Sequence, residues 1–271
     1  MALLFLVLSI PLITLIKPWF PLWNSNTETK GELSLMTYNV RYFYDDFNGI
    51  QDLIVSKRPD VFFFQEMGAN PEKIIEALGS EEPYFFENYN SLGIASVYPI
   101  IETNQIRHEN YPLCAVYSDI AMPQDTIRLI NVYLESLHLN QEEIKQTSAN
   151  TADVSYKSKM LISKVATASQ VHQQQIKLIK KVIKNSPHPV ILGGDFNAVP
   201  TSFEYYKLRE NLIDGFTVSG YQIGHTFRTL GVPLKLDYIF TSKDLKTTRY
   251  EILKVNYSDH YPTWAEFSFI D

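Results

Sequence analysis

The chain has 271 residues, of which 45% are hydrophobic and 13% aromatic, and its formal net charge is −6. This length suits one large α/β domain with a short extension, or two small domains, and the composition is not that of a disordered chain. The negative charge gives no overall basic field that would gather nucleic acid. Because Cys114 is the only cysteine, an intramolecular disulfide and a cysteine-based zinc site are both excluded.

The first 23 residues form a separate hydrophobic segment. Residues 1–16 carry no charge, Lys17 follows, and residues 18–23 are aromatic and proline-containing, as is typical of a membrane interface. The basic start and the small-residue cleavage site of a secretory signal are both missing. We therefore expect residues 1–23 to be a membrane anchor, with a signal sequence as the alternative. Residues 24–31 are then a polar linker, and the side of the membrane stays open, with an extracytoplasmic domain preferred.

From residue 32 onward, short apolar runs alternate with helical patterns and turn residues. The runs predict strands at 33–40, 61–64, 92–97, 115–120, 126–134, 189–192, 234–240 and 264–270. Helical spacing of apolar residues predicts helices at 50–56, 71–78, 159–184 and 202–208. This mixture indicates an α/β domain that spans residues 32–271.

One of these predicted strands runs directly into two glycines, after which Asp195 and Asn197 stand two positions apart. We expect both polar side chains to leave the strand end on a loop, where they can converge on a ligand. Gly, Asp and Asn are also ordinary turn residues. The stretch alone therefore does not distinguish a catalytic loop from a plain turn.

Polar residues follow the same rule at the ends of other predicted strands. Asn39, Glu66 and the pair Asp259-His260 all stand at or beyond such ends. Glu66 and Asp259 are hard oxygen ligands that, with Asn39, suit one Mg²⁺. Each residue by itself has an alternative as a turn or surface residue, but their joint occurrence favours a shared site.

The remaining candidates complete a phosphoester-cleaving chemistry. Asp195 can accept a proton from an attacking water that Asn197 orients. His260 can donate hydrogen bonds to a phosphate oxygen, and Asp237 is the carboxylate that would fix its tautomer. A metal, a base and cationic donors together suit a transition state whose charge lies on oxygen atoms.

Six motifs in this order resemble the endonuclease/exonuclease/phosphatase superfamily, the deoxyribonuclease I-like fold. They are Met36 to Arg41, Phe64 to Glu66, Gly93 to Ser96 with Tyr98 to Ile100, Gly194 to Asn197, Leu236 to Ile239, and Ser258 to Pro262. The resemblance covers about residues 31–271. It implies a four-layer α/β/β/α sandwich of two mixed β-sheets flanked by helices, and hydrolysis of a phosphodiester or phosphomonoester with Mg²⁺ or Mn²⁺.

Carried over onto this chain, the family pattern assigns Glu66, Asn39 and Asp259 to the metal. It assigns water activation to Asp195, orientation and a phosphate contact to Asn197, and a phosphate contact to His260, which Asp237 supports. Hydrolase branches usually have a catalytic histidine where this chain has Tyr133. At neutral pH a phenol is a poorer acid than imidazolium, so Tyr133 is either a functional substitute or a sign of weakened activity.

These observations predict a membrane-anchored, metal-dependent phosphoesterase with a monomeric catalytic domain. The substrate class stays open among nucleic acids, inositol phosphates and phospholipid headgroups, so a DNA or RNA endonuclease is one alternative. The other alternative is a catalytically weakened or silent binding protein, which the substitution at Tyr133 motivates.

Overall fold

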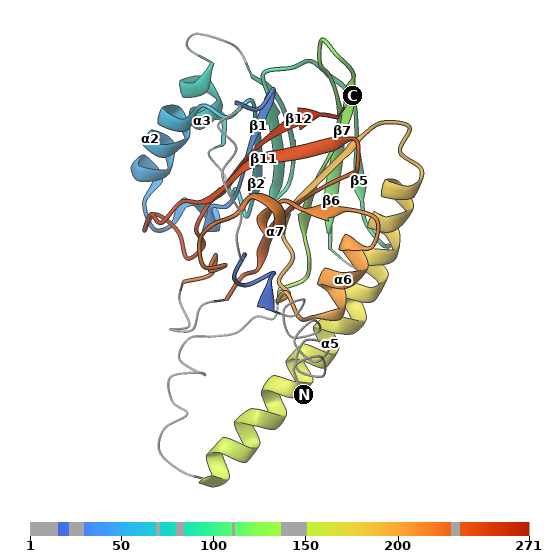
Figure 1. Cartoon of the computed structure of the whole chain (residues 1–271). Coiled ribbons are helices and arrows are strands. Elements are labelled where there is room, and N and C mark those ends of the chain that lie inside the picture. Colours follow the sequence, from blue (N-terminus) through green and yellow to red (C-terminus); the bar gives the residue numbers. More distant parts are fainter. Residues whose placement is uncertain are drawn as a thin grey trace, which may run out of the picture.

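The computed structural model describes residues 16–21, 30–68, 71–79, 84–109, 112–136, 151–228 and 234–270, with only the backbone described at 151–162 and 165. Two mixed six-stranded sheets pack face to face, and helices cover their outer faces (Figure 1). This arrangement is the four-layer α/β/β/α sandwich, and the predicted fold class is confirmed.

The first sheet has the strand order β11-β12-β1-β2-β4-β3. Its strands are β1 (Leu33–Asn39), β2 (Val61–Gln65), β3 (Phe85–Tyr89), β4 (Leu92–Ser96), β11 (Leu245–Ile252) and β12 (Thr263–Phe269). Only β1 and β2 run parallel to each other. Helices α2 (Phe47–Lys57) and α3 (Pro71–Leu78) cover the outer face of this sheet, where Ile54 and Ile74 pack against Phe62 and Phe64.

The second sheet has the order β5-β6-β7-β8-β10-β9. Its strands are β5 (Ile100–Ile106), β6 (Ala115–Ala121), β7 (Thr126–Tyr133), β8 (Val190–Asp195), β9 (Ile213–Asp214) and β10 (Asp237–Thr241). Here β7 and β8 are the parallel pair. Helices α5 (Thr151–Lys184) and α6 (Phe203–Arg209) cover the outer face, and the first half of α5 extends beyond the sheets (Figure 1). The 3₁₀ turn η1 (Arg41–Phe43) and the short helix α7 (Gly215–Ser219) complete the described elements.

A buried polar link joins the two sheets across their otherwise apolar interface. The Nε2 atom of Gln65 on β2 donates to Oδ1 of Asn131 on β7 at 2.6 Å. The Nδ2 atom of Asn131 donates in turn to the carbonyl oxygens of Phe64 and Gly93, both at 2.8 Å. Both amide side chains are fully buried, and their hydrogen-bond partners all lie within the protein. The link therefore fixes how the two sheets pack on each other.

Close approach of β7 and β8 depends on Gly194. A Cβ atom at this position would lie 2.0 Å from the carbonyl oxygen of Val132, and φ of Gly194 is +131°. Only glycine adopts this conformation without strain. The glycine therefore lets the strand end of β8 lie against that of β7, one residue before Asp195.

Most predicted elements are confirmed, although several bounds differ. Helix α5 begins at Thr151, before the predicted 159, and β10 begins at Asp237 rather than at 234. The sequence predicted that Asp195 would lie on the loop after the strand, but it is the last residue of β8. Strands β3, β5, β9 and β11 were not predicted, since β3 and β5 are largely exposed and lack a clear apolar alternation.

The predicted anchor and linker lie mostly outside the described residues. Of the hydrophobic segment, Ile16 to Pro21 are described, and there the carbonyl oxygen of Trp19 accepts a hydrogen bond from the backbone N–H of Gly224 at 2.8 Å. Pro18 is buried in the same place. Within the part of the chain that the structure describes, no helix is both long and apolar enough to span a membrane.

Candidate active site

Three polar residues lie side by side at the ends of three neighbouring inner strands of the second sheet. Tyr133 on β7 and Asp237 on β10 each stand directly opposite Asp195 on β8. Residues directly opposite each other on neighbouring strands project from the same face of a sheet. The strand register therefore places a phenol and two carboxylates together, with Asp195 between the other two.

Two amides hold the carboxylate of Asp195, which is 1% exposed. The Nδ2 atom of Asn39 donates to Oδ2 at 3.1 Å, and the backbone N–H of Asn197 donates to Oδ1 at 2.8 Å. Asn197 adopts a left-handed backbone with φ of 47°, which asparagine tolerates well. Its Nδ2 atom donates to the carbonyl oxygen of Leu134 at 2.9 Å, so the loop after β8 is fixed to the end of β7.

The first sheet contributes Asn39 at the end of β1 and Glu66 just after β2. The Nδ2 atom of Asn39 also donates to Oε1 of Glu66 at 3.1 Å, so this amide bridges Glu66 and Asp195. The Oη atom of Tyr133 donates to the same Oε1 atom at 2.7 Å. Glu66 has a left-handed backbone with φ of 50°, a strained conformation that is typical of functional sites.

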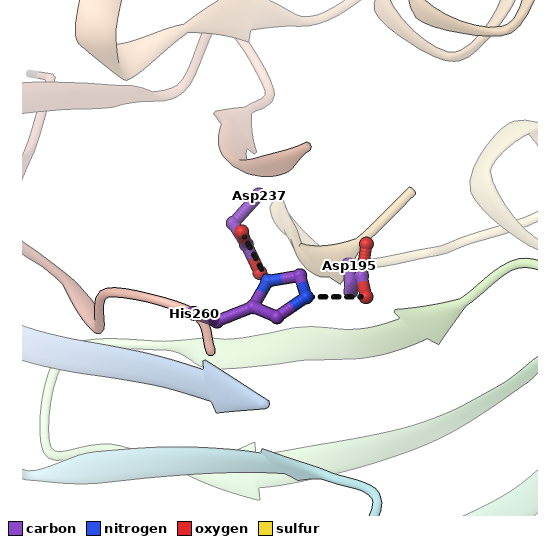
Figure 2. Close-up of side chains that lie close together, drawn as sticks. All are labelled: Asp195, Asp237 and His260. Atoms are coloured by element: carbon purple, nitrogen blue, oxygen red, sulfur yellow. Dashed lines mark hydrogen bonds and ion pairs between the residues drawn. The ribbon is translucent and has the colours of Figure 1, made fainter. Parts of the chain in front are cut away.

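His260 lies between two carboxylates (Figure 2). Its Nδ1 atom is 2.9 Å from Oδ2 of Asp237, and its Nε2 atom is 3.6 Å from Oδ2 of Asp195. The ring of Phe227 packs on the imidazole with the centroids 4.9 Å apart. Burial alone would lower the pKa of His260, but Asp237 and Asp195 outweigh it and raise this pKa to about 10, so the imidazole is positively charged at neutral pH.

The surroundings also raise the pKa values of Asp195 and Tyr133. Burial raises the pKa of Asp195 to about 7, with His260 opposing the shift and Asp237 adding to it. Burial, followed by the charges of Glu66 and Asp195, raises the pKa of Tyr133 far above its usual range. Tyr133 is therefore a neutral hydrogen-bond donor at all ordinary pH values.

Glu66 and Asp259 offer the oxygen atoms that a hard divalent cation requires, and both line one cavity. Glu66 uses Oε1 for Asn39 and Tyr133, while Asp259 accepts from Ser258 Oγ at 3.3 Å and lies 3.5 Å from Nε of Arg41. The donor set suits Mg²⁺ or Mn²⁺. Ligand atoms of Asp195, Asp237 and His260 also lie within 4.8 Å of one another, but a protonated imidazole cannot ligate a metal.

The candidate site opens into a cavity of about 530 Å³ that extends from Glu66, Asp195 and His260 to α5 and α6. At its far end the Nδ1 atom of His172 is 3.2 Å from Oε1 of Glu204. Oxygen Oε1 of Gln175 accepts from the backbone N–H of Glu135 at 3.2 Å. The sequence prediction missed these residues, although a histidine and a glutamine on the buried face of an amphipathic helix were a usable signal.

The structure brings together all eight residues that the sequence predicted for the site. Direct contacts join seven of them, and Asp259 lines the same cavity as Glu66, Asp195, Asn197 and His260. The metal-binding and catalytic roles of the eight stay predictions.

A family model described as "Endonuclease/Exonuclease/phosphatase family" matches residues 36–260. Because this match covers most of the chain, the protein belongs to the endonuclease/exonuclease/phosphatase family, and the resemblance seen in the sequence is confirmed. No curated protein matches the chain in sequence.

Solved structures with the same fold are distant in sequence. A humanized TDP2 of D. rerio is 18% identical with a TM-score of 0.62, over 87% of this chain and 98% of that one. The 3′ phosphatase NExo from Neisseria, bound to a product DNA hairpin, is 16% identical with a TM-score of 0.63, over 87% and 99%. A mannosyl-6-phosphatase from Bacteroides thetaiotaomicron is 16% identical with a TM-score of 0.59, over 88% and 100%. At these identities the likeness shows a shared fold.

Proposed function

We propose that this protein is a divalent-metal-dependent hydrolase of phosphoester bonds in which Asp195 activates the attacking water. The position of Asp195 carries the proposal, since it is buried between Tyr133 and Asp237 and held by Asn39 and Asn197. Burial raises its pKa to about 7, and a general base is most effective when its pKa is close to the working pH.

The attack is in line. The water oxygen forms a bond to phosphorus and its proton passes to Asp195. The ester P–O bond on the opposite side breaks, and its electron pair leaves with the alcohol oxygen, which takes up a proton from solvent. Asn197 orients the water, and the positively charged His260 donates a hydrogen bond to a phosphate oxygen. Asp237 holds the imidazole through Nδ1, and Tyr133 fixes Glu66 through its hydroxyl group.

Glu66 and Asp259, supported by Asn39, would hold the Mg²⁺ or Mn²⁺ ion. When bound, such an ion supplies positive charge that stabilises the negative charge on phosphate oxygens. Asn39 bridges Glu66 and Asp195 through one amide group. A substitution there is therefore expected to disturb the metal ligand and the base together.

Membrane attachment through residues 1–23, with the monomeric domain on the extracytoplasmic side, is the second part of this proposal. It is supported by the uncharged run 1–16 and the aromatic stretch that follows. Extraction of cell membranes with alkaline carbonate tests it: an anchored protein stays in the pellet, whereas release into the supernatant contradicts the anchor. Nucleic acids, inositol phosphates and phospholipid headgroups are the candidate substrate classes.

The activity is tested with the full chain in detergent micelles, with p-nitrophenyl phosphate and bis-p-nitrophenyl phosphate as substrates. We expect turnover with Mg²⁺ or Mn²⁺, its loss on chelation, and a decrease of at least about 10³-fold in Asp195→Ala. The control Asp52→Ala changes an exposed aspartate on α2 and is expected to retain activity. Equal rates for wild type and Asp195→Ala, or no response to the chelator, would overturn the proposal.

A further inference from the structure

The cavity beside the catalytic residues has two chemically different ends. One end contains Glu66, Asp195, Asp259 and His260, where the phosphate is expected to bind. The other end lies between α5 and α6 and contains His172, Ser169 and Glu204. A volume of about 530 Å³ is within the usual range for small-molecule pockets, so the far end has room for the organic part of a substrate.

Glu204 and His172 at this far end are held by contacts within the protein. Glu204 is 6% exposed, and its Oε1 atom lies 3.2 Å from His172 Nδ1 and 3.3 Å from Ser169 Oγ. The other ring nitrogen of His172, Nε2, donates to the carbonyl oxygen of Glu135 at 2.8 Å. Both ring nitrogens of His172 are thus in contact with other protein groups.

No lysine or arginine is among the described residues that line the cavity, whereas four carboxylates are: Glu66, Asp195, Glu204 and Asp259. Two arginines contact Asp259 or the residue before it, and neither is among the residues that line the cavity. Arg41 is paired with Asp45 and Asp259, and Arg228 donates to the carbonyl oxygen of Ser258 at 2.6 Å. A second phosphate placed at the far end would therefore face Glu204, with no lysine or arginine among the described residues that line the cavity.

The remaining lining groups at the far end suit an uncharged, hydroxylated molecule. Hydroxyl groups come from Ser136, Ser169 and Ser202, and apolar surface comes from Phe203 and Leu236. Carboxylate and hydroxyl oxygens accept hydrogen bonds from alcohols, and apolar side chains cover the C–H faces. Burial would raise the pKa of Glu204, but its bond to His172 lowers it below the usual range, so this carboxylate is ionised and acts as an acceptor.

Resting on the phosphoesterase activity proposed above, we infer that the α5–α6 end of the cavity binds the alcohol part of the substrate, and that this alcohol is uncharged and polyhydroxylated. The substrate then carries a single phosphate, as sugar and polyol monophosphates do. Glu204 is the residue that discriminates against a second phosphate. Oligonucleotides and multiply phosphorylated alcohols are consequently expected to bind poorly.

Competitive inhibition of p-nitrophenyl phosphate hydrolysis by the full chain tests this inference. The probes are inorganic phosphate, sorbitol 6-phosphate, the corresponding hexitol 1,6-bisphosphate and a short oligonucleotide. We expect sorbitol 6-phosphate to inhibit at least about 10-fold more tightly than each of the other three. A bisphosphate or oligonucleotide that inhibits as tightly as the monophosphate overturns the inference, as does a monophosphate no better than inorganic phosphate.

Two variants locate the effect. Glu204→Gln is expected to reduce the preference for monophosphate over bisphosphate at least about 5-fold, while Glu210→Gln, an exposed glutamate directly after α6, leaves it unchanged. Ser169→Ala, a smaller change, is expected to weaken sorbitol 6-phosphate but not inorganic phosphate. An unchanged preference in Glu204→Gln, or, if that variant does not fold, an unchanged affinity in Ser169→Ala, contradicts the inference. Hydrolysis of bis-p-nitrophenyl phosphate alone contradicts the inference, whereas absence of hydrolysis of both nitrophenyl substrates overturns the proposed function instead.

Discussion

Two buried histidines line the same cavity and each is paired with a carboxylate, but the two pairs differ in what the second ring nitrogen contacts. In the pair His260–Asp237, Nε2 lies 3.6 Å from the carboxylate of Asp195. In the pair His172–Glu204, Nε2 donates to a backbone carbonyl at 2.8 Å. The first histidine faces a group that can exchange a proton, whereas the second is fully occupied by the protein.

The carboxylates beside these histidines show the same contrast. Burial raises the pKa of Asp195, so ionising this group costs folding free energy. The bond to His172 lowers the pKa of Glu204 against the effect of burial, so its ionised form stabilises the fold. We therefore expect the third partner of a buried histidine–carboxylate pair to decide whether the pair serves catalysis or structure.

The largest effect is expected from replacing the two histidines in turn. His260→Gln removes a cationic donor to the phosphate and should lower kcat for p-nitrophenyl phosphate about 10²- to 10³-fold. His172→Gln removes a group that contacts protein only in the described structure, so kcat should fall less than about 10-fold. Circular dichroism and thermal unfolding establish that both variants are folded. Similar kcat losses in the two variants would contradict the distinction between the pairs.

An intermediate effect on kcat is expected at Tyr133, which contacts the predicted metal ligand Glu66 and belongs to neither histidine pair. Tyr133→Phe removes the donor to Glu66 Oε1, and we expect kcat to fall about 10-fold, with a weaker apparent affinity for Mg²⁺ in a titration. Tyr133→His provides the residue that other hydrolases of this family are expected to have. If Tyr133→Phe is unchanged and Tyr133→His raises turnover, the tyrosine is a sign of weakened activity.

The smallest effect is a pair of opposite changes in stability, measured by thermal unfolding in chelator. Between pH 4 and 7 folded Asp195 keeps a proton that the unfolded chain has released, so its contribution to the free energy of unfolding falls as pH rises. Asp195→Asn should therefore raise Tm at pH 7 by about 2–4 °C, the equivalent of about 1 kcal/mol. The gain should vanish near pH 4.

The contribution of Glu204 to stability changes with pH in the opposite direction, because its pKa is lowered in the folded state. Its stabilisation is complete above the pKa of the unfolded carboxyl group and is lost as pH falls through the folded value. Glu204→Gln should therefore lower Tm at pH 7, with the deficit shrinking in acid. Changes of the same sign in Asp195→Asn and Glu204→Gln would refute the opposite roles of the two carboxylates.

The end of the cavity that contains the candidate catalytic residues was predictable from the sequence because these residues lie at or just after the ends of strands. Asn39, Glu66 and Asp195 each end an apolar run that is long enough to read as a strand. What the sequence could not provide is the register, since Tyr133 and Asp237 reach Asp195 only through strands distant in the chain. The bridging amide of Asn39 between Glu66 and Asp195 also depends on how the two sheets pack.

The other end of the cavity was not predicted, for a different physical reason. His172 interrupts an apolar helical face between Ala168 and Ile176, and its partners Glu135 and Glu204 come from a loop and from another helix. No local pattern links these positions. Likewise β3 and β5 were missed because edge strands with exposed faces lack the burial that produces an apolar alternation.

Strand β12 pairs with β1 at the centre of the first sheet, with Leu33 opposite Phe267 and Thr37 opposite Thr263. The strand that ends at Asn39 therefore has as one neighbour a strand more than two hundred residues later in the chain. His260 and Asp259 precede β12 by only a few residues. A chain without β12 would leave β1 without one neighbouring strand and the segment with His260 without the strand that follows it, so we expect the proposed hydrolytic activity only when β12 is present.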